Sequence, residues 1–459
     1  MLTGQQYKDS LKDGRKVYFQ GELIEDLETV PALAAPLNEV ASGYDKYFNA
    51  DPDAINPVTM APMSAADLRD RIPVITEMDL LTNTTYQSLM TLSVAAARLE
   101  AHVPEVVPRI RAYVEQARKD DIRITECITD AKGNRSLAPS KQEDPDSYVR
   151  VVERRPDGVV IRGAKLHISA AAFGHDLMVM PTKAMKPGEE DYSIAACIPA
   201  NSPGVHMTNT TYHPTGRDPR DFPVSSHRSI PDSMVIFDDV FVPAERIFLD
   251  GQTAHAAVFA HSLGLWERLG GVSFMVEQAD ELVGLASLIA EANGTAKISH
   301  VREKIDEMMI HATLLRAGLE AALAHANSTP EGYFYPDDMY TNVTKYQGAS
   351  QFNTMVKHLH DIAGGAVVTA PSMLDFDNPE LRPYLEKYMS TGSTVSGEYR
   401  TKLFHAIRDT TADSFGGWHF VTNLQSGGGL FAQRLVTRKN YDLERARALA
   451  LKAAGLSGA

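Results

Sequence analysis

The chain has 459 residues, enough for two or three domains and a large buried core. Its formal net charge of −14 opposes binding to phosphate backbones and anionic membranes, so neither nucleic acid nor membrane is expected as a partner. Two cysteines, Cys127 and Cys197, are too few for a disulfide framework or a four-cysteine cluster. The polar N-terminus and the lack of a long apolar run predict a cytoplasmic protein.

Three regions with different periodicities follow one another along the chain. Residues 67 to 116 have the apolar spacing of helices, as in LMTLSVAAARLEAHVPEVV. Residues 148 to 249 contain short β-rich runs between turns, beginning with the hairpin pattern YVRVVERRPDGVVIRGAKLHI. Long amphipathic segments such as VREKIDEMMIHATLLRAGLEAALAHA follow. We therefore predict an α+β chain with an N-terminal mainly helical domain (1–140), a middle β-barrel or sandwich (141–255) and a C-terminal helical bundle (256–459).

Five passages carry a resemblance to a known family. They are ITDAKGNRSLAPS at 128–140, RGAKLHISAAAFGHDLMVMPT at 162–182, VIFDDVFVPAERIF at 235–248, HDIAGGAVVTAPS at 360–372 and GGGLFAQR at 427–434. In this order and spacing they resemble the family of 4-hydroxyphenylacetate 3-hydroxylases and 4-hydroxybutyryl-CoA dehydratases. The resemblance implies an acyl-CoA-dehydrogenase-like fold, FAD bound between domains, and a dimer or tetramer.

The passage from 128 to 135 resembles the loop that covers the flavin in this family. Gly133 permits close backbone approach, and Lys132 and Arg135 can offset phosphate charge. A solvated turn with two ordinary basic residues is the alternative interpretation. The cofactor contacts that the resemblance implies in this loop are Ile128, Thr129, Asp130, Lys132 and Arg135.

Two further places are expected beside the flavin. In the family the position of Ser169 usually holds a hydroxyl residue near the flavin N5 edge, which implies a catalytic and cofactor-binding role. His167 is a candidate for the same roles. For both residues the alternative is a purely structural role. Gly364 and Gly365 end a helix, as a C-cap would, and in the family this pair reaches the FAD of a neighbouring subunit.

The sequence departs from its relatives at positions that carry their chemistry. The iron–sulfur ligands of the dehydratases correspond here to Thr85, Leu89, Leu265 and Val272. None of these residue types ligates such a cluster, so no metal is expected. The substrate-facing His of the hydroxylases corresponds to Glu126, a candidate base in a pocket lined by Leu89, Leu92 and Leu265. An exposed glutamate at a strand end is the alternative.

Without the cluster, the resemblance implies a monooxygenase. It would take reduced FAD (FADH2) from a separate flavin reductase and transfer one oxygen atom of O2 to a small organic substrate, with an aromatic ring as the expected acceptor. Two alternatives stay open: a non-oxygenating flavoenzyme such as a CoA-thioester isomerase or dehydrogenase on the same scaffold, and a cofactor-free binding homologue. A homo-oligomer, a tetramer or dimer, is expected because bundle helices pair across subunits in this fold.

Overall fold

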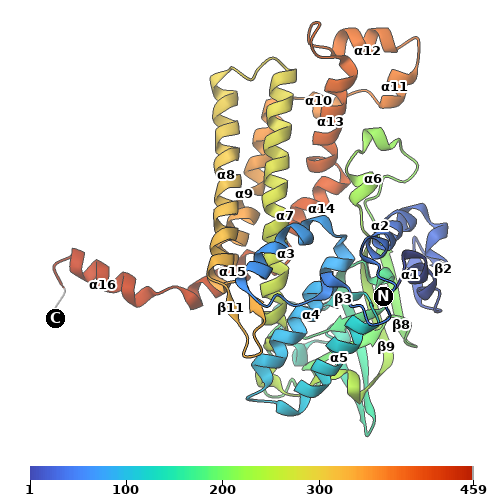
Figure 1. Ribbon diagram of the computed structural model, residues 1–459, viewed down its shortest axis with the longest axis vertical. Coiled ribbons are helices and arrows are strands. Elements are labelled where there is room, and N and C mark those ends of the chain that lie inside the picture. Colours follow the sequence, from blue (N-terminus) through green and yellow to red (C-terminus); the bar gives the residue numbers. More distant parts are fainter. Residues whose placement is uncertain (457–459) are drawn as a thin grey trace.

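The computed structural model describes residues 1–456, which form a broad base and a narrower helical extension (Figure 1). The base holds the N-terminal helices and two β-sheets, and the extension holds the long helices of the C-terminal half. The N-terminal helices are α1 (Gly4–Ser10), α2 (Pro31–Tyr47), α3 (Ala65–Glu77), α4 (Leu80–Leu99) and α5 (Val107–Lys119). None of the helices within residues 1–456 combines the length and the apolarity that crossing a membrane requires.

Side chains at the helix starts explain where several of these helices begin. Thr3, Ser64 and Asp79 accept hydrogen bonds from backbone N–H groups in the first turns of α1, α3 and α4. Helix α4 is buried around most of its circumference, although nine of its 20 residues are polar. Its polar side chains therefore lie inside the protein, where they need partners.

Two open sheets form the β-domain, and residues 1–456 contain no closed barrel, which was one of the two expected forms. The larger sheet has the strand order β2-β1-β8-β9-β5-β4, and the smaller has the order β10-β7-β6-β3. The strands are β1 (Lys16–Phe19), β2 (Glu22–Ile24), β3 (Ile124–Cys127), β4 (Arg150–Arg155), β5 (Gly158–Ser169), β6 (Asp176–Val179), β7 (Ile194–Pro199), β8 (Val205–Thr210), β9 (Asp232–Pro243) and β10 (Ile247–Asp250).

The strands do not all come from the middle of the chain. Strand β1 pairs in parallel with β8, with Lys16 opposite His206, and β2 pairs with the free side of β1. Strand β3 pairs in parallel with β6. Residues before position 140 therefore extend the larger sheet and form one edge of the smaller sheet.

The smaller sheet separates two hydrophobic cores because successive side chains of a strand point to opposite faces. Leu177 and Val179 lie in the core between the two sheets, whereas Met178 lies in the core against the helices. In β3, Ile124 is on the helical side and Cys127 is in the core between the sheets. The same alternation puts the side chain of Glu126, two residues after Ile124, on the helical side as well.

The extension is built on three long helices that pack side by side, α7 (Ala257–Ala292), α8 (Ser299–Ala324) and α9 (Asp338–Ala363). The first half of α7 packs on α4 in the base, and the second half belongs to the core of the extension. Helix α7 thus connects the two parts of the molecule.

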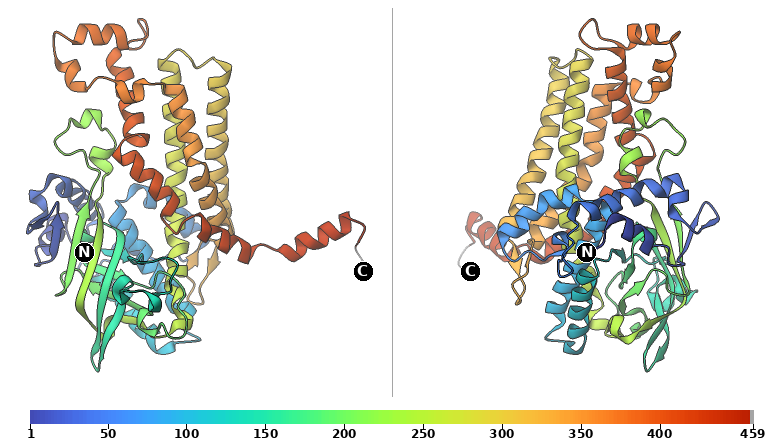
Figure 2. Two further views of the ribbon diagram at one scale, coloured as in Figure 1. Left: turned by 180° about the vertical axis from the view of Figure 1, so that it is seen from behind. Right: turned by 45° about the vertical axis from the view of Figure 1, so that its right-hand side comes forward.

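Shorter elements complete the C-terminal half. They are α10 (Ala366–Thr369), α11 (Met373–Asp377), α12 (Arg382–Met389), α13 (Gly397–Thr411), α14 (Ser414–Gln425), α15 (Leu430–Asn440), α16 (Leu443–Ala453) and a small hairpin of β11 (Asn327–Ser328) and β12 (Phe334–Tyr335). Helix α16 projects away from the rest of the chain, and none of its residues is buried (Figure 2).

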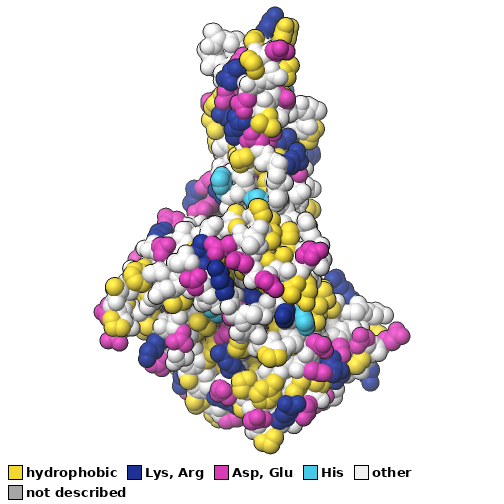
Figure 3. Space-filling view, turned by 90° about the vertical axis from the view of Figure 1, so that its right-hand side faces the viewer, with side chains coloured by type: hydrophobic (Ala, Val, Ile, Leu, Met, Phe, Trp, Pro, Cys, Tyr) yellow, Lys and Arg dark blue, Asp and Glu magenta, His cyan; other side chains and the backbone are white. Residues whose placement is uncertain are grey.

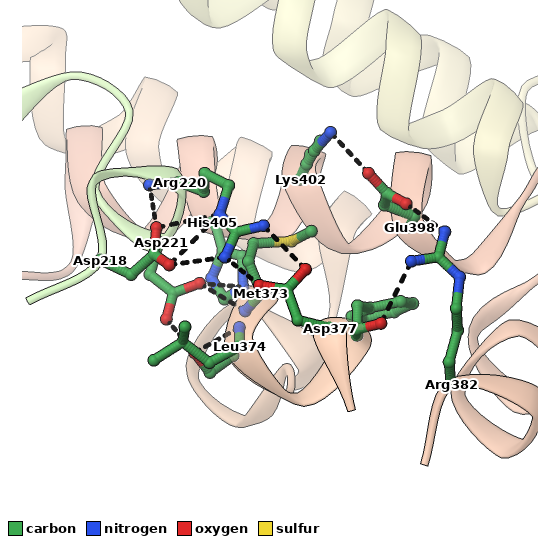
Figure 4. A network of polar contacts seen from close by, with 12 residues as sticks. Asp218, Arg220, Asp221, Met373, Leu374, Asp377, Arg382, Glu398, Lys402 and His405 are labelled. Atoms are coloured by element: carbon green, nitrogen blue, oxygen red, sulfur yellow. Dashed lines mark hydrogen bonds and ion pairs between the residues drawn. The ribbon is translucent and has the colours of Figure 1, made fainter. Parts of the chain in front are cut away.

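A polar network joins the β-domain to the extension (Figure 4). The loop before the short helix α6 (Ser225–Arg228) carries Asp221, which accepts hydrogen bonds from the hydroxyl of Ser372 and from the N–H of Met373, over 2.5 and 2.7 Å. Arg220 of the same loop contacts Asp377 at 2.5 Å. These contacts hold the long β8–β9 connection against α11 and α13.

The surface is mixed in charge on the face that carries the N-terminal helices and the outer strands (Figure 3). Acidic and basic side chains are interspersed there, and no broad basic stripe is visible. This distribution agrees with the net charge of −14 and lacks the electrostatic footprint of a nucleic-acid-binding face.

Candidate active site

The loop that follows β3 lies beside several cations. Lys132 has a left-handed backbone, with φ of 70°, and Arg135 is exposed. Burial and then the charge of Arg135 lower the pKa of Lys132, and the charge of Lys183 acts in the same direction. Lys183 was not suggested by the sequence pattern. Three cationic side chains are therefore concentrated at this loop in an otherwise acidic protein.

Gly133 is required by the packing of the loop itself. Its φ is +47°, and a Cβ at this position would lie 2.5 Å from Oε1 of Gln142 and 2.8 Å from Oγ of Ser147. Any side chain here would push apart the two segments that shape the loop. The glycine thus permits a close approach between parts of the protein.

Asp130 and Lys165 form a buried ion pair under this loop. The ammonium nitrogen of Lys165 lies 2.8 Å from Oδ1 of Asp130, and it also donates to the carbonyl oxygens of Ile128 and Met180. Asp130 further accepts a hydrogen bond from the N–H of Val149 over 2.9 Å. Its carboxylate is fully engaged within the protein, so we assign it to holding the loop in place.

The other two loop residues expected at the cofactor contribute backbone oxygens to the same support. The hydroxyl of Thr182 donates to the carbonyl of Ile128 over 2.7 Å, and the N–H of Leu166 donates to the carbonyl of Thr129 over 2.7 Å. The loop is therefore fixed along its first residues, and its two cations, the half-buried Lys132 and the exposed Arg135, follow the fixed part.

The end of β5 has an irregular backbone around Ser169. His167 and Ala170 both have positive φ, 62° and 60°, and the pairing with β9 shifts register between Lys165 and Ile168. Non-glycine residues rarely adopt this conformation, and it is common at functional sites. The side chain of His167 is exposed, whereas Ser169 is half-buried.

The hydroxyl of Ser169 is bonded to a carboxylate that the sequence did not suggest. It donates to Oδ1 of Asp232 over 2.5 Å, and the indole N–H of Trp418 donates to Oδ2 of the same carboxylate over 2.9 Å. Trp418 lies against Tyr212 and Phe415, with ring centroids at 4.9 and 5.6 Å. Burial raises the pKa of Asp232, and the two hydrogen bonds act in the opposite direction.

Glu126 lies inside the protein, on the face of β3 that points to the helices. Its Oε1 is shielded from solvent and has no hydrogen-bond partner within residues 1–456. Burial, followed by the charge of Glu267, raises the pKa of Glu126 well above its ordinary value. The residue as a whole is half-buried while Oε1 is shielded, so the alternative of an exposed glutamate at the strand end is wrong. The raised pKa means that this carboxyl keeps its proton to a higher pH than an ordinary glutamate does.

The core that packs against this face of β3 contains both apolar side chains and buried polar atoms of α4. The expected lining residues Leu89, Leu92 and Leu265 are almost completely buried in the same core. Across the contact of α4 with α7, a Cβ at Gly270 would lie 2.5 Å from Nε2 of Gln87. The buried polar atoms of α4 without a partner among the described residues are Asn83 Oδ1, Tyr86 Oη, Ser88 Oγ and Thr91 Oγ1.

Lys345 of α9 is a further buried ion that sequence reasoning missed. Its side chain is 1 % exposed, and its Nζ donates to the carbonyl of Asn423 over 2.7 Å. Burial lowers the pKa of Lys345 to about 8, although the nearby Glu267 acts to raise it. Glu267 in turn accepts the N–H of Gly427 over 2.7 Å, in the glycine-rich loop between α14 and α15. The only sequence signal was a lysine inside an amphipathic helix.

One chain does not bring all the expected residues together. Gly364 and Gly365 are exposed at the junction of α9 with α10, in the upper part of the extension, whereas β3 and the end of β5 lie in the base (Figure 1). Gly364 ends α9 with φ of 81°, so a C-cap explains it. A Cβ at either glycine would meet nothing within 4 Å in the same chain.

Comparison with known proteins identifies the family. Residues 3–249 match the model of the 4-hydroxyphenylacetate 3-hydroxylase N terminal, and residues 256–455 match that of the C terminal. The chain belongs to the 4-hydroxyphenylacetate 3-hydroxylase family. It is 27% identical over 495 residues to the 4-hydroxybutyryl-CoA dehydratase/vinylacetyl-CoA-Delta-isomerase of Clostridium aminobutyricum, covering 99% of this chain and 100% of that protein.

Other members of the hydroxylase family are oxygenases. The oxygenase component of 4-hydroxyphenylacetate 3-monooxygenase from Thermus thermophilus is 27% identical over 90% of this chain and 89% of its own length. A solved structure of such a component complexed with FAD superposes with a TM-score of 0.87 at 25% identity, covering 99% of this chain and 100% of that one. The archaeal 4-hydroxybutyryl-CoA dehydratase from N. maritimus gives a TM-score of 0.88 at 26% identity, covering 100% and 95%. The acyl-CoA-dehydrogenase-like fold is confirmed.

The donor set does not fit the iron–sulfur cluster of the family's dehydratases. At the four matched positions, Leu89, Leu265 and Val272 are buried hydrocarbons. The hydroxyl of Thr85 is committed to the backbone, since it donates to the carbonyl of Leu81 over 2.8 Å and accepts the N–H of Ile124 over 2.9 Å. The two cysteines belong to different cores, on opposite faces of the smaller sheet.

Proposed function

We propose that this chain is the oxygenase component of a two-component monooxygenase. It binds FADH2 delivered by a separate flavin reductase and transfers one atom of O2 to a small organic substrate, with an aromatic ring as the expected acceptor. Relatives that carry names such as FADH(2)-dependent monooxygenase support this assignment, at 26% identity over 97% of the chain. The observation that carries the proposal is the donor set at the four matched positions, which does not fit the dehydratases' cluster and so favours the flavin chemistry of the oxygenases.

The residues at the loop after β3 fit an FAD molecule. Lys132, Arg135 and Lys183 supply the kind of donors that a pyrophosphate needs, and in a protein of net charge −14 this attraction has to be local. We assign the isoalloxazine ring to the side of Ser169, whose half-buried hydroxyl lies next to a strained backbone. When bound, reduced flavin supplies the electrons that activate O2.

We assign proton transfer to Glu126. Because burial raises its pKa, the carboxyl can keep its proton and donate a hydrogen bond to an oxygen atom of the substrate. After oxygen transfer the carboxyl can pass this proton to the ketone oxygen left on the ring and take the proton that the ring carbon releases, so that it ends protonated again. Leu89, Leu92 and Leu265 exclude water from this place, and they favour a substrate with a large apolar part.

A homo-oligomer completes the proposed site. Gly364 and Gly365 are exposed in the extension and their ideal Cβ atoms meet nothing within 4 Å in their own chain, so we assign them to the cofactor of a neighbouring subunit. The apolar side chains Leu443, Leu449 and Leu451 of α16 are also exposed. We expect a tetramer or dimer in light scattering, and a fully active monomer would contradict this part of the proposal.

The test is a single-turnover assay with chemically reduced FAD. The protein is loaded anaerobically with FADH2, mixed with a panel of phenols and other small aromatics, and exposed to isotopically labelled O2. We expect a product that contains one labelled oxygen atom. If the protein binds FADH2 tightly but labels no compound of a broad panel, while a family oxygenase does so in parallel, the monooxygenase assignment is wrong.

One observation favours a second candidate, a CoA-thioester isomerase. A buried carboxyl of raised pKa suits proton transfer between carbon atoms, and the Clostridium relative is named as a vinylacetyl-CoA Δ-isomerase as well as a dehydratase. Double-bond migration in vinylacetyl-CoA under strictly anaerobic conditions would establish this function instead. The third possibility, a cofactor-free binding protein, predicts that the chain takes up no flavin at all, which the absorbance of protein incubated with FAD tests directly.

A further inference from the structure

The direction of the hydrogen bond between Ser169 and Asp232 is fixed by chemistry. The hydroxyl of Ser169 donates to Oδ1 across the 2.5 Å contact and the indole N–H of Trp418 donates to Oδ2, so both oxygens of Asp232 act as acceptors, as they do in a carboxylate. A serine hydroxyl has only one proton to donate. Any third group that meets the oxygen of Ser169 therefore finds an acceptor.

Two independent constraints keep Asp232 in this position. Its backbone is the register partner of Ser169 at the end of the β5–β9 ladder, and it is also paired with Thr210 of β8. Its second oxygen accepts the indole N–H of Trp418 over 2.9 Å. The carboxylate thus has one oxygen for each donor, and helix α14 of the extension takes part in orienting a residue of the β-domain.

The aromatic side chains around Trp418 restrict its movement. Phe415 and His419 of the same helix lie against it, with ring centroids at 5.6 and 5.3 Å, and Tyr212 covers it from the β8–β9 connection. Ser169, Asp232 and Trp418 are each half-buried, so the group is rigid on one side and accessible on the other. This is the arrangement expected of a preorganised binding surface.

The polarity of Ser169 distinguishes the two redox states of a flavin. N5 of oxidised flavin has a lone pair and no hydrogen, whereas N5 of reduced flavin carries an N–H. We propose that Asp232 is a positioning residue that fixes Ser169 as a hydrogen-bond acceptor and so makes the site selective for reduced over oxidised FAD. This inference rests on the proposed function, in which the ring of FAD lies beside Ser169.

The selectivity suits an enzyme that receives its flavin from another protein. Oxidised FAD left after turnover meets an oxygen that cannot donate to N5, so it is released, and a reduced molecule takes its place. The chain has no need of a reductase domain for this exchange. The same contact would be of no use to an enzyme that keeps one FAD through both redox states.

The experiment measures the dissociation constants of oxidised and reduced FAD, the latter under anaerobic conditions and without substrate. In Asp232→Asn the side-chain amide can donate to Ser169, which frees the hydroxyl to donate to N5 of oxidised flavin. We expect the preference for reduced FAD, expressed as the ratio of the two constants, to fall by about tenfold. Asp238→Asn, an exposed aspartate on the same strand, is the matched control and should leave the ratio unchanged.

A second background shows whether Asp232 acts through Ser169. Ser169→Ala alone should lower the preference for reduced FAD, and adding Asp232→Asn to it should change the ratio no further. An unchanged ratio in Asp232→Asn, or an equal effect of this change with and without Ser169, would overturn the inference. If Asp232→Asn does not fold, an unchanged ratio in Ser169→Ala alone would also overturn the inference. Because no O2 or substrate is present, a failed hydroxylation assay leaves this result intact, whereas a chain that binds neither form of FAD refutes the proposed function itself.

Discussion

The ammonium of Lys165 and the carboxylate of Asp130 are joined at 2.8 Å, with side chains only 1 % and 2 % exposed. Lys165 stands in β5, and Asp130 stands at the start of the loop that carries Lys132 and Arg135. The pair connects the core of the β-domain to the proposed binding loop. Removing one partner would leave the other charge buried without compensation.

We expect Lys165→Met to lower the free energy of unfolding by about 3–5 kcal/mol, the usual cost of breaking a buried pair on one side. The double variant Lys165→Met/Asp130→Leu removes both charges and should recover a large part of the loss. Urea denaturation followed by circular dichroism measures both values. A loss below about 1 kcal/mol in the single variant would mean that Asp130 is solvated in solution.

Substitution of Arg135 should weaken the binding of FAD. The exposed guanidinium follows the fixed part of the loop and is free to meet phosphate oxygens. We expect Arg135→Ala to raise the dissociation constant of reduced FAD by about tenfold. Arg155→Ala, an exposed arginine at the β4–β5 hairpin, serves as the control. Equal affinities of the two variants would show that the loop is not part of the cofactor site.

Ser169→Ala should separate oxygen consumption from product formation. Removing the hydroxyl removes a hydrogen bond beside the reactive edge of the flavin. Such a bond is worth roughly 1.5–3 kcal/mol, which corresponds to about a ten- to hundredfold change in the rate of peroxide release. The variant should consume O2 with FADH2 and release mostly hydrogen peroxide. Peroxide and product are quantified together in each assay, with Ser42→Ala as an exposed serine control. Wild-type coupling in Ser169→Ala would give this residue a structural role only.

Glu126 predicts a particular dependence of stability on pH. Its folded-state pKa is raised, so the folded chain binds more protons than the unfolded chain above about pH 4.3. Its contribution is therefore fully present at low pH and is lost as the pH rises towards the folded-state pKa. Glu126→Gln removes this loss, so the stability of the variant relative to wild type should increase as the pH rises above about 5. Parallel stability curves would contradict the buried, neutral carboxyl.

Purified protein should contain no iron–sulfur cluster. The reason is the set of side chains at Thr85, Leu89, Leu265 and Val272, which offers no thiolate or imidazole. Iron and sulfide are measured on protein isolated under anaerobic conditions from cells that are supplied with iron. A content of about four irons per chain would contradict both this prediction and the exclusion of cluster chemistry.

The fold was predictable because the hydrophobic periodicity that indicates it extends over many residues. The order of helices, strands and helices appears in the hydrophobic periodicity, and the family motifs occur in both halves. The contribution of the N-terminal segment to the larger sheet was not predictable. Strand β1 has only four residues, and its partner β8 lies far along the chain, so no local pattern specifies their pairing.

The site was less predictable because its contacts join distant residues. Asp232 lies just before the motif at 235–248, and only the register of β5 with β9 brings it to Ser169. Trp418 comes from a helix that carries no family motif. The burial of Glu126 depends on the packing of α4 against β3, which cannot be predicted from the alternation of one short strand.

The parallel ladder between Lys16–Phe19 and the strand Val205–Thr210 has a consequence for how the protein is made. During synthesis the first residues leave the ribosome long before their partner strand exists, and they must wait with an open edge exposed. The larger sheet can close only after most of the β-domain has been translated, which makes its assembly slow and dependent on non-local contacts. Expression at low temperature or with chaperones should therefore raise the soluble yield.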